Sequence, residues 1–188
     1  MRGAISALVQ EGVLRAEQGR GTFIERKQKL AYPIGARTRF SEGLQGQAKD
    51  RRGILLAHAV EVPDARTMSA LGLYEGEKVL RLETVSEADG RPVSRATSFF
   101  PATRFTGIEK LYAQSGSITA ALKLFGIDDY FRRSTLISAR HASDADLADL
   151  RLSPGAIVIA TVYTNVDPAE NPIQFSDTRF AADLVELS

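Results

Sequence analysis

Apolar and polar residues alternate with a period of two over several long segments, and this pattern predicts β-strands. The predicted strands span residues 54–62, 78–86, 92–100, 129–140, 156–166 and 173–180. The run Ala88-Asp89-Gly90-Arg91 between two of them is typical of a tight hairpin turn. Such short connections predict that consecutive strands pair in antiparallel fashion.

Short helical segments with recognisable caps lie between the strands. Asp64, Ser117 and Ser143 each precede such a segment, as N-cap residues do. Gly72 follows the first helix and Gly126 the second, and glycine is the common residue after a last helical turn. The sequence therefore predicts three short helices.

The segment that follows Asp64 and the segment that follows Ser143 share one order: helix, turn, strand, turn, strand. The matched positions are Leu71 with Leu150, Leu73 with Leu152, Gly76 with Gly155, Val79 with Val158, Pro92 with Pro172, and Phe100 with Phe180. Two such units imply pseudo-symmetric halves that share one sheet. The predicted fold class is therefore α+β, an antiparallel sheet with flanking helices built from two helix–hairpin repeats.

Composition narrows the class of protein. The chain has 44% hydrophobic and 25% charged residues, which is ordinary for a soluble globular protein. It contains no cysteine, so disulfides and thiolate metal sites are excluded. No apolar run has the length of a membrane span or a signal peptide, and we expect a cytoplasmic protein.

The net charge of +1 hides an uneven distribution. Residues 1–52 carry eleven Lys/Arg and five Asp/Glu, whereas the rest of the chain carries thirteen and eighteen. A basic end on a mildly acidic body is typical of a nucleic-acid-facing segment joined to another domain. A solvated linker has the same pattern, so charge alone leaves both interpretations open.

A glycine-tipped hairpin is predicted near the N-terminus by the run Gln18-Gly19-Arg20-Gly21-Thr22-Phe23-Ile24. An arginine on such a tip can reach into a nucleic-acid groove. Residues 4–9 have helical spacing, and Glu11-Gly12-Val13-Leu14 leads into the hairpin. An ordinary helix and hairpin is the alternative. In this order, residues 4–24 resemble the end of the winged helix-turn-helix of GntR-type bacterial regulators of the HutC branch.

The rest of the chain extends this resemblance. Tyr32-Pro33-Ile34-Gly35 and Arg37-Thr38-Arg39-Phe40-Ser41-Glu42 are similar to the linker and first effector loop of that branch, particularly of its phosphonate-metabolism regulators. Residues 30–187 resemble the UTRA effector-binding domain, which shares its fold with chorismate lyase. The resemblance implies a ligand-responsive transcriptional repressor that senses a small anionic metabolite, binds operator DNA and forms a homodimer.

Three parts are expected. Residues 1–25 are a winged-helix remnant with the end of the recognition helix and the wing, residues 26–36 a linker, and residues 37–188 the UTRA-like domain. The family's module has two further helices before the recognition helix, so we do not expect this chain to bind DNA specifically by itself. The resemblance assigns remnant DNA contacts to Arg2, Arg15, Gly19, Arg20 and Gly21.

Two features predict an anion-binding site. Residues 37–41 place two arginines and two hydroxyls within five residues, which suits a phosphate or phosphonate group. Surface pairing of the arginines with Glu42 and Asp50 is the alternative. Strand alternation also groups hydroxyl and amide side chains on single faces. These residues are Thr84 and Ser86, Ser94 and Ser98, and Gln174, Ser176 and Thr178. Such a face needs a polar ligand, water or open solvent.

The resemblance implies that the effector contacts the first loop, the first hairpin, the helix start after it and the last strand. Sugar-phosphate-sensing relatives carry arginines at the positions of Thr84 and Ser86 and a carboxylate at Ala96, so a sugar phosphate is disfavoured here. Arginines of the first loop, or Arg95, would then balance the charge of the anion. The predicted effector-binding residues are Arg37, Thr38, Arg39, Phe40, Ser41, Thr84, Ser86, Arg95, Ser98, Ser117, Thr119, Gln174 and Ser176.

The sequence does not predict an enzyme. His58 and His141 lie on predicted strands without a nucleophile or carboxylate at motif spacing, and the helical spacing of Asp144, Asp146 and Asp149 favours a solvated face over a metal site. Nucleotide-binding, serine-hydrolase and zinc-protease motifs are missing. We expect no catalytic residue, metal or cofactor. A free-standing small-molecule-binding module and a chorismate-lyase-like enzyme are the alternatives.

Overall fold

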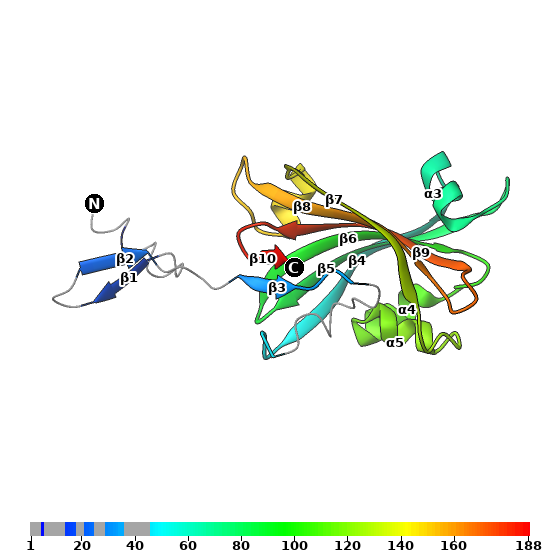
Figure 1. The fold of residues 1–188 in the computed structure, drawn as a ribbon, viewed down its shortest axis with the longest axis horizontal. Coiled ribbons are helices and arrows are strands. Elements are labelled where there is room, and N and C mark those ends of the chain that lie inside the picture. The colour runs from blue at the N-terminus through cyan, green and yellow to red at the C-terminus, as the bar shows by residue number, and fades with distance from the viewer. Residues whose placement is uncertain (1–4, 6–13, 18–20, 25–28, 36–45) are drawn as a thin grey trace.

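The computed structural model of the protein describes residues 5, 14–17, 21–24, 29–35 and 46–188. Its centre is a six-stranded sheet in the order β4-β5-β6-β9-β8-β7, in which all neighbours are antiparallel (Figure 1). The strands are β4 (Arg51–Glu61), β5 (Val79–Ala88), β6 (Arg91–Pro101), β7 (Phe131–His141), β8 (Ile157–Val166) and β9 (Pro172–Ala181). All six strands predicted from alternation are confirmed.

The sheet consists of two copies of one unit. Each copy runs strand, helix, hairpin: β4, α3 (Ala65–Leu71), β5 and β6, then β7, α6 (Asp144–Asp149), β8 and β9. The sheet order is therefore the same from either edge, and β6 meets β9 at the centre, from Ser94 opposite Phe180 to Phe99 opposite Phe175. The predicted α+β fold with two helix–hairpin repeats is confirmed.

Local chemistry explains where these elements begin and turn. The Asp64 carboxylate accepts a hydrogen bond of 2.7 Å from the Thr67 amide and caps α3. Ser143 and Asp146 form a reciprocal capping box at α6. Asp89 and Gly90 both have positive φ, 50° and 74°, as the turn of a two-residue hairpin requires.

Two further helices, α4 (Ile108–Ser115) and α5 (Ile118–Lys123), lie between the two copies in the sequence and cover one face of the sheet (Figure 1). Ile108, Tyr112 and Leu122 pack there against Leu82 and other side chains of the sheet in the largest core cluster. Ser117 caps α5 as predicted, through a 3.2 Å bond from the Ala120 amide. Helix α4 was not predicted.

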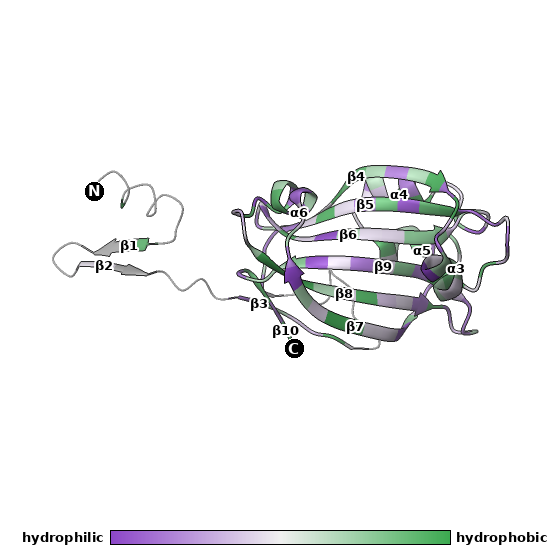
Figure 2. Cartoon of the chain, turned by 90° about the horizontal axis from the view of Figure 1, so that it is seen from above, coloured by the Kyte–Doolittle hydropathy of each residue, from purple (hydrophilic) through white to green (hydrophobic). Residues whose placement is uncertain are grey.

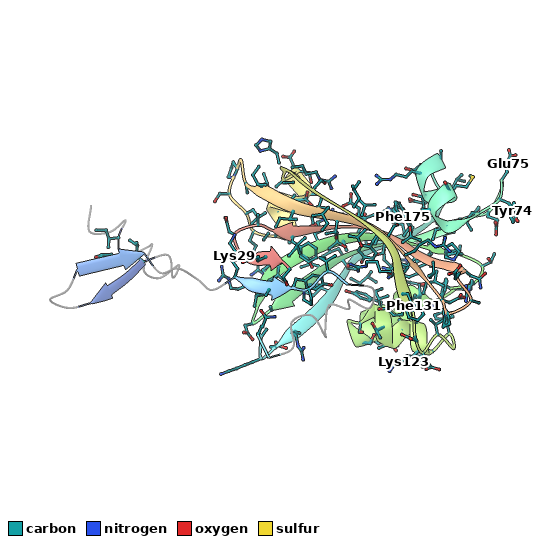
Figure 3. The ribbon with its side chains drawn as sticks, viewed as in Figure 1. Lys29, Tyr74, Glu75, Lys123, Phe131 and Phe175 are labelled. Carbon is teal, nitrogen blue, oxygen red and sulfur yellow. The ribbon has the colours of Figure 1, made fainter. Side chains whose placement is uncertain are left out.

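The opposite face of the sheet carries α3 and α6. Helix α3 packs through Leu71 on Val79 and Phe175, and Figure 3 shows Phe175 at the middle of the sheet. Helix α6 is held by charged side chains: the Arg179 Nε lies 3.2 Å from Asp146 Oδ1, and the side chains are only 4% and 2% exposed. Seen from above, β6 and β9 alternate polar and apolar stretches (Figure 2). On one face of the sheet, α4 and α5 therefore pack through apolar side chains, whereas on the other face α6 is held by ion pairs.

A second, smaller sheet joins the two ends of the described body. Strand β3 (Leu30–Tyr32) pairs in parallel with β10 (Val185–Leu187), and Tyr32 is buried against Phe180 with ring centroids 5.0 Å apart. Figure 3 shows Lys29 just before this strand. Part of the predicted linker, residues 26–36, thus packs into the body of the effector domain.

The predicted N-terminal hairpin is confirmed. Strands β1 (Leu14–Glu17) and β2 (Gly21–Ile24) pair antiparallel, with Glu17 opposite Gly21. Of the predicted DNA-contacting residues, Arg15 lies on β1 and Gly21 on β2, whereas Arg2, Gly19 and Arg20 lie outside the described residues. In the part of the chain that the structure describes, no helix has the length and apolar character to cross a membrane.

Candidate effector-binding cavity

A cavity of about 280 Å³ lies between the sheet and the helices α4 and α5. Its walls come from every strand of the main sheet, from both helices and from β3, the strand within the predicted linker (the linker strand). The residues that line it are Tyr32, Arg51, Arg52, Gly53, Thr84, Ser86, Ser94, Ala96, Ser98, Tyr112, Ser115, Gly116, Ser117, Ile118, Thr119, Tyr130, Arg132, Thr161, Tyr163, Asn165, Gln174, Thr178 and Phe180. A pocket of this volume suits a small metabolite.

Most of the predicted site residues that the structure describes come together here. Those that line the cavity are Thr84, Ser86, Ser98, Ser117, Thr119 and Gln174. Ser176 is fully buried and does not line the cavity itself, but it shares a 2.9 Å hydrogen bond with Ser98, which does. The hydroxyl-rich face that alternation predicted is therefore the floor of a cavity.

Arg95 requires a correction, because it does not reach the cavity. Its side chain lies on the opposite face of the sheet, where its Nε is 2.6 Å from Asp149 and an Nη is 3.1 Å from Glu83. The period of two explains this placement: Ser94 and Ser98 face the cavity, so the intervening odd-numbered residues face away. Arg95 links α6 to the sheet.

The predicted first loop, Arg37, Thr38, Arg39, Phe40 and Ser41, lies outside the described residues. Ser117 does line the cavity, but its hydroxyl already caps α5, which is only six residues long. Among the described residues, the polar groups available to a ligand therefore lie mainly on the sheet and on β3.

Hydrogen bonds connect the polar floor into one chain. The Asn165 amide donates to Gln174 at 2.8 Å, and the Gln174 amide donates to Ser98 Oγ at 3.2 Å. Ser176 joins Ser98 and approaches Thr178 Oγ1 at 3.5 Å. Connected buried polar groups hold one another in place, so the floor offers preorganised donors and acceptors to a ligand.

Tyrosines form much of the wall. Four of the five tyrosines of the chain, Tyr32, Tyr112, Tyr130 and Tyr163, line the cavity, whereas Tyr74 lies on the exposed loop after α3 (Figure 3). Burial raises the pKa of Tyr112 to about 12, although its hydrogen bond with Thr84 acts in the other direction. Its hydroxyl stays protonated at neutral pH and remains a hydrogen-bond donor.

The charge of the cavity is of one sign. Arg51 and Arg52 at the start of β4 and Arg132 on β7 contribute guanidinium groups, and the described lining residues include no Asp or Glu. An anionic ligand is the expected complement of such a lining.

Arg132 is the most enclosed of the three arginines. Its guanidinium carbon lies 3.7 Å from the centre of the Tyr163 ring, a close cation–π contact. Among the described residues, its buried Nε has no hydrogen-bond partner. Burial raises the pKa of the nearby Tyr32 hydroxyl above its ordinary range, and the Arg132 cation lowers it in part. The cavity therefore contains a cation that is held against a tyrosine ring and has a donor for which the described residues provide no acceptor.

Sequence alone did not indicate Arg132, because a β-bulge intervenes. The register of β7 on β8 shifts between Arg132 and Ser134, so that Arg132 lies opposite Asn165 and Thr135 opposite Tyr163. A bulge inserts one residue and breaks the period of two. Strict alternation from Thr135 would place Arg132 on the wrong face.

The described residues contain no group of three or more His, Asp or Glu side chains that could hold a metal ion. The aspartates of α6 take part in capping and ion pairs with Arg95 and Arg179. The described residues that line the cavity offer arginine, hydroxyl, amide and aromatic groups to a ligand.

Comparison with known proteins defines the class to which this fold and cavity belong. The UTRA domain model matches residues 47–186. A transcriptional regulator of the HTH type from Rhizobium meliloti (strain 1021), itself uncharacterized, is 49% identical over 187 residues, which cover 100% of this chain and 77% of the relative. The chain belongs to the UTRA domain family, within the ligand-responsive transcriptional regulators of the GntR type.

Within this class, the chain is similar to proteins named PhnF. The "Probable transcriptional regulator PhnF" of Escherichia coli (strain K12) is 25% identical over 190 residues, covering 100% of this chain and 78% of that protein. The crystal structure of PhnF from Mycobacterium smegmatis superposes with a TM-score of 0.75 at 23% identity, covering 100% of this chain and 81% of the other. The structural likeness confirms the fold, and the sequence relatives are regulators of transcription.

Proposed function

We propose that the cavity is the effector site of a transcriptional repressor and that its ligand is a small anion, a phosphonate or a phosphorylated compound. The observation that carries the proposal is the lining of the cavity. Its described residues include three arginines and no carboxylate, and its floor consists of hydrogen-bonded hydroxyl and amide groups. Phosphonate and phosphate oxygens accept several charge-assisted hydrogen bonds at once, which arginine forks and hydroxyls supply.

The proposed site has two parts. The sheet contributes Thr84, Ser86, Ser98, Gln174 and the supporting Ser176, and residues 37–41 contribute Arg37, Arg39 and two hydroxyls. The two arginines and two hydroxyls within these five residues support their part in anion binding. Ligand binding would then favour one of two states of the loop and linker, provided that the two states bind the ligand unequally.

The proposal also assigns the remaining parts of the chain. Residues 1–25 belong to a winged helix of the kind that contacts operator DNA, and the β1–β2 hairpin supports the assignment of its wing. We propose a homodimer as the working state, since the edge strand β7 exposes the apolar side chains Leu136 and Ile137, which a second copy would cover. The relatives are regulators of transcription, and we propose no catalytic role.

Calorimetric titration of the purified chain tests the proposal. The panel consists of inorganic phosphate, methylphosphonate, glucosamine 6-phosphate and chorismate, with dimethyl methylphosphonate as an uncharged mimic. We expect methylphosphonate or phosphate to bind and the uncharged ester not to bind. Arg39→Ala should weaken binding, whereas Arg140→Ala should not, because Arg140 pairs with Asp177 on the other face of the sheet.

Two outcomes would reject the proposal. Equal binding of the charged and uncharged phosphonates would show that the cavity does not select an anion. Release of pyruvate from chorismate would show a lyase activity and return the enzyme hypothesis.

A further inference from the structure

The linker strand contributes directly to the wall of the cavity. Tyr32 is the last residue of β3, and its side chain is 5% exposed and packs against Phe180, another lining residue. The segment that leads from the N-terminal hairpin to the main body therefore contributes a side chain to the cavity.

Tyr32 and Arg132 form one unit within this wall. The Arg132 guanidinium is stacked on Tyr163, while its buried Nε has no hydrogen-bond partner among the described residues. The Tyr32 side chain lines the same cavity, close enough for the Arg132 cation to lower the pKa of its hydroxyl. One anion in the cavity can therefore contact both the Arg132 guanidinium and the Tyr32 hydroxyl.

We propose that Arg132 is the principal anion-binding residue of the cavity and that Tyr32 joins the same anion, so that ligand binding tightens the linker strand β3 against β10. This inference rests on the proposed anion site and adds to it both the residue that binds the charge and the path to the linker. Arg51 and Arg52 are exposed at the rim, where water screens their charges, whereas Arg132 is partly enclosed.

The strand that would respond, β3, is three residues long and pairs with β10 at the margin of the described body. The amide of Leu30 donates to Leu184 at 2.8 Å, that of Ile34 to Ser188 at 2.7 Å, and that of Ala31 to the Gln47 side chain at 2.7 Å. Short edge pairings of this kind open more easily than a central sheet. An additional bond from Tyr32 to a bound anion would therefore change their opening measurably.

The experiment combines titration with hydrogen exchange, using methylphosphonate and, in parallel, inorganic phosphate as probes. Loss of one charge-assisted bond predicts that Arg132→Gln weakens binding roughly 10- to 100-fold. The matched control is Arg133→Gln, the adjacent arginine of β7, which is exposed and donates instead to the Glu170 carbonyl. It should bind the probe as the wild type does.

Exchange of the amides in residues 30–34 tests the path to the linker. With the probe at ten times its Kd, we expect exchange to slow by up to about tenfold. The reason is that the probe binds only while β3 is paired with β10, so bound probe lowers the population in which β3 is open. Tyr32→Phe keeps the ring against Phe180 and removes only the hydroxyl, so it should bind more weakly and lose most of this protection.

The outcomes separate the two proposals. If the wild type binds neither probe, the proposed anion site itself fails. If the wild type binds and Arg132→Gln, folded by circular dichroism, binds equally well, Arg132 is not the anion-binding residue. If Arg132→Gln loses binding but Tyr32→Phe retains the full protection of residues 30–34, the coupling through Tyr32 is refuted.

Discussion

The buried ion pair that fixes α6 to the sheet gives a quantitative prediction for Asp146→Asn. The replacement keeps the shape of the side chain and removes its charge. The Arg179 Nε donates to Asp146 at 3.2 Å, and both side chains are almost fully buried. Removing one partner of a buried pair costs roughly 3–5 kcal/mol, because the other charge remains without compensation.

The surroundings of Arg179 place the expected loss at the lower end of this range. Asp177 and Glu83 remain 3.7 and 4.0 Å from its guanidinium and compensate part of the charge. We therefore expect Asp146→Asn to lower the free energy of unfolding by about 3 kcal/mol. With a slope of about 2 kcal/mol per M, the urea midpoint should fall by about 1.5 M.

Acid titration adds an independent check. Burial would raise the pKa of Asp146, but hydrogen bonds from Ser143 and Arg179 together lower it below the ordinary 3.8. A carboxyl whose pKa is lower in the folded state stabilises the fold above its unfolded pKa, and this contribution is lost as the pH falls through the folded pKa. The stability of the wild type should therefore fall more steeply below about pH 4 than that of Asp146→Asn.

Ser143→Ala is the control, since it removes the cap of α6 and leaves the ion pair. Its expected cost is about 1 kcal/mol. Urea unfolding at pH 7, followed by circular dichroism, measures both variants. A loss for Asp146→Asn no larger than that for Ser143→Ala would refute the argument that the buried charge, rather than the cap, dominates.

Two further predictions concern the junction of α4 with β4. In Gly53→Ala the new Cβ would lie 2.5 Å from Tyr112 Oη and closer still to the Gly116 carbonyl oxygen, so thermal unfolding should show a loss of about 3 kcal/mol. Gly76→Ala, with open space but a positive φ, should lose only about 1 kcal/mol, and equal losses would contradict the close approach. Because the pKa of Tyr112 is raised to about 12, the folded state should lose on the order of 1 kcal/mol between pH 9 and pH 11 as the unfolded tyrosine ionises. Tyr112→Phe should show a smaller loss over this interval, and an unchanged loss would exclude Tyr112 as its source.

Much of the fold was predictable because its signals are local. Alternation marked the six strands, and Asp64, Ser117 and Ser143 marked three helices through side-chain caps that the structure contains. Helix α4 gave no such signal, since its N-cap residue is Gly107, which has no side chain to form a capping hydrogen bond. The pairing of β3 with β10 was also out of reach, because it joins two three-residue strands from distant parts of the chain.

The candidate site was predictable in its neutral part and not in its charged part. The hydroxyls of β5 and β6 followed from alternation within regular strands. The same rule excludes Arg95 from the face of Ser94 and Ser98. Arg132 depends on a bulge, which alternation cannot reveal.

One face of β6 and β9 lines the cavity and the other face holds α6, and this separation has a consequence for how such a protein changes during evolution. The residues of these strands that line the cavity have even numbers, and the arginines that hold α6 through ion pairs have odd numbers. A substitution at Ser98 or Thr178 can therefore alter which metabolite is recognised while the ion pairs of Arg95 and Arg179 stay intact. New specificities can arise from this scaffold without first acquiring compensating mutations for stability.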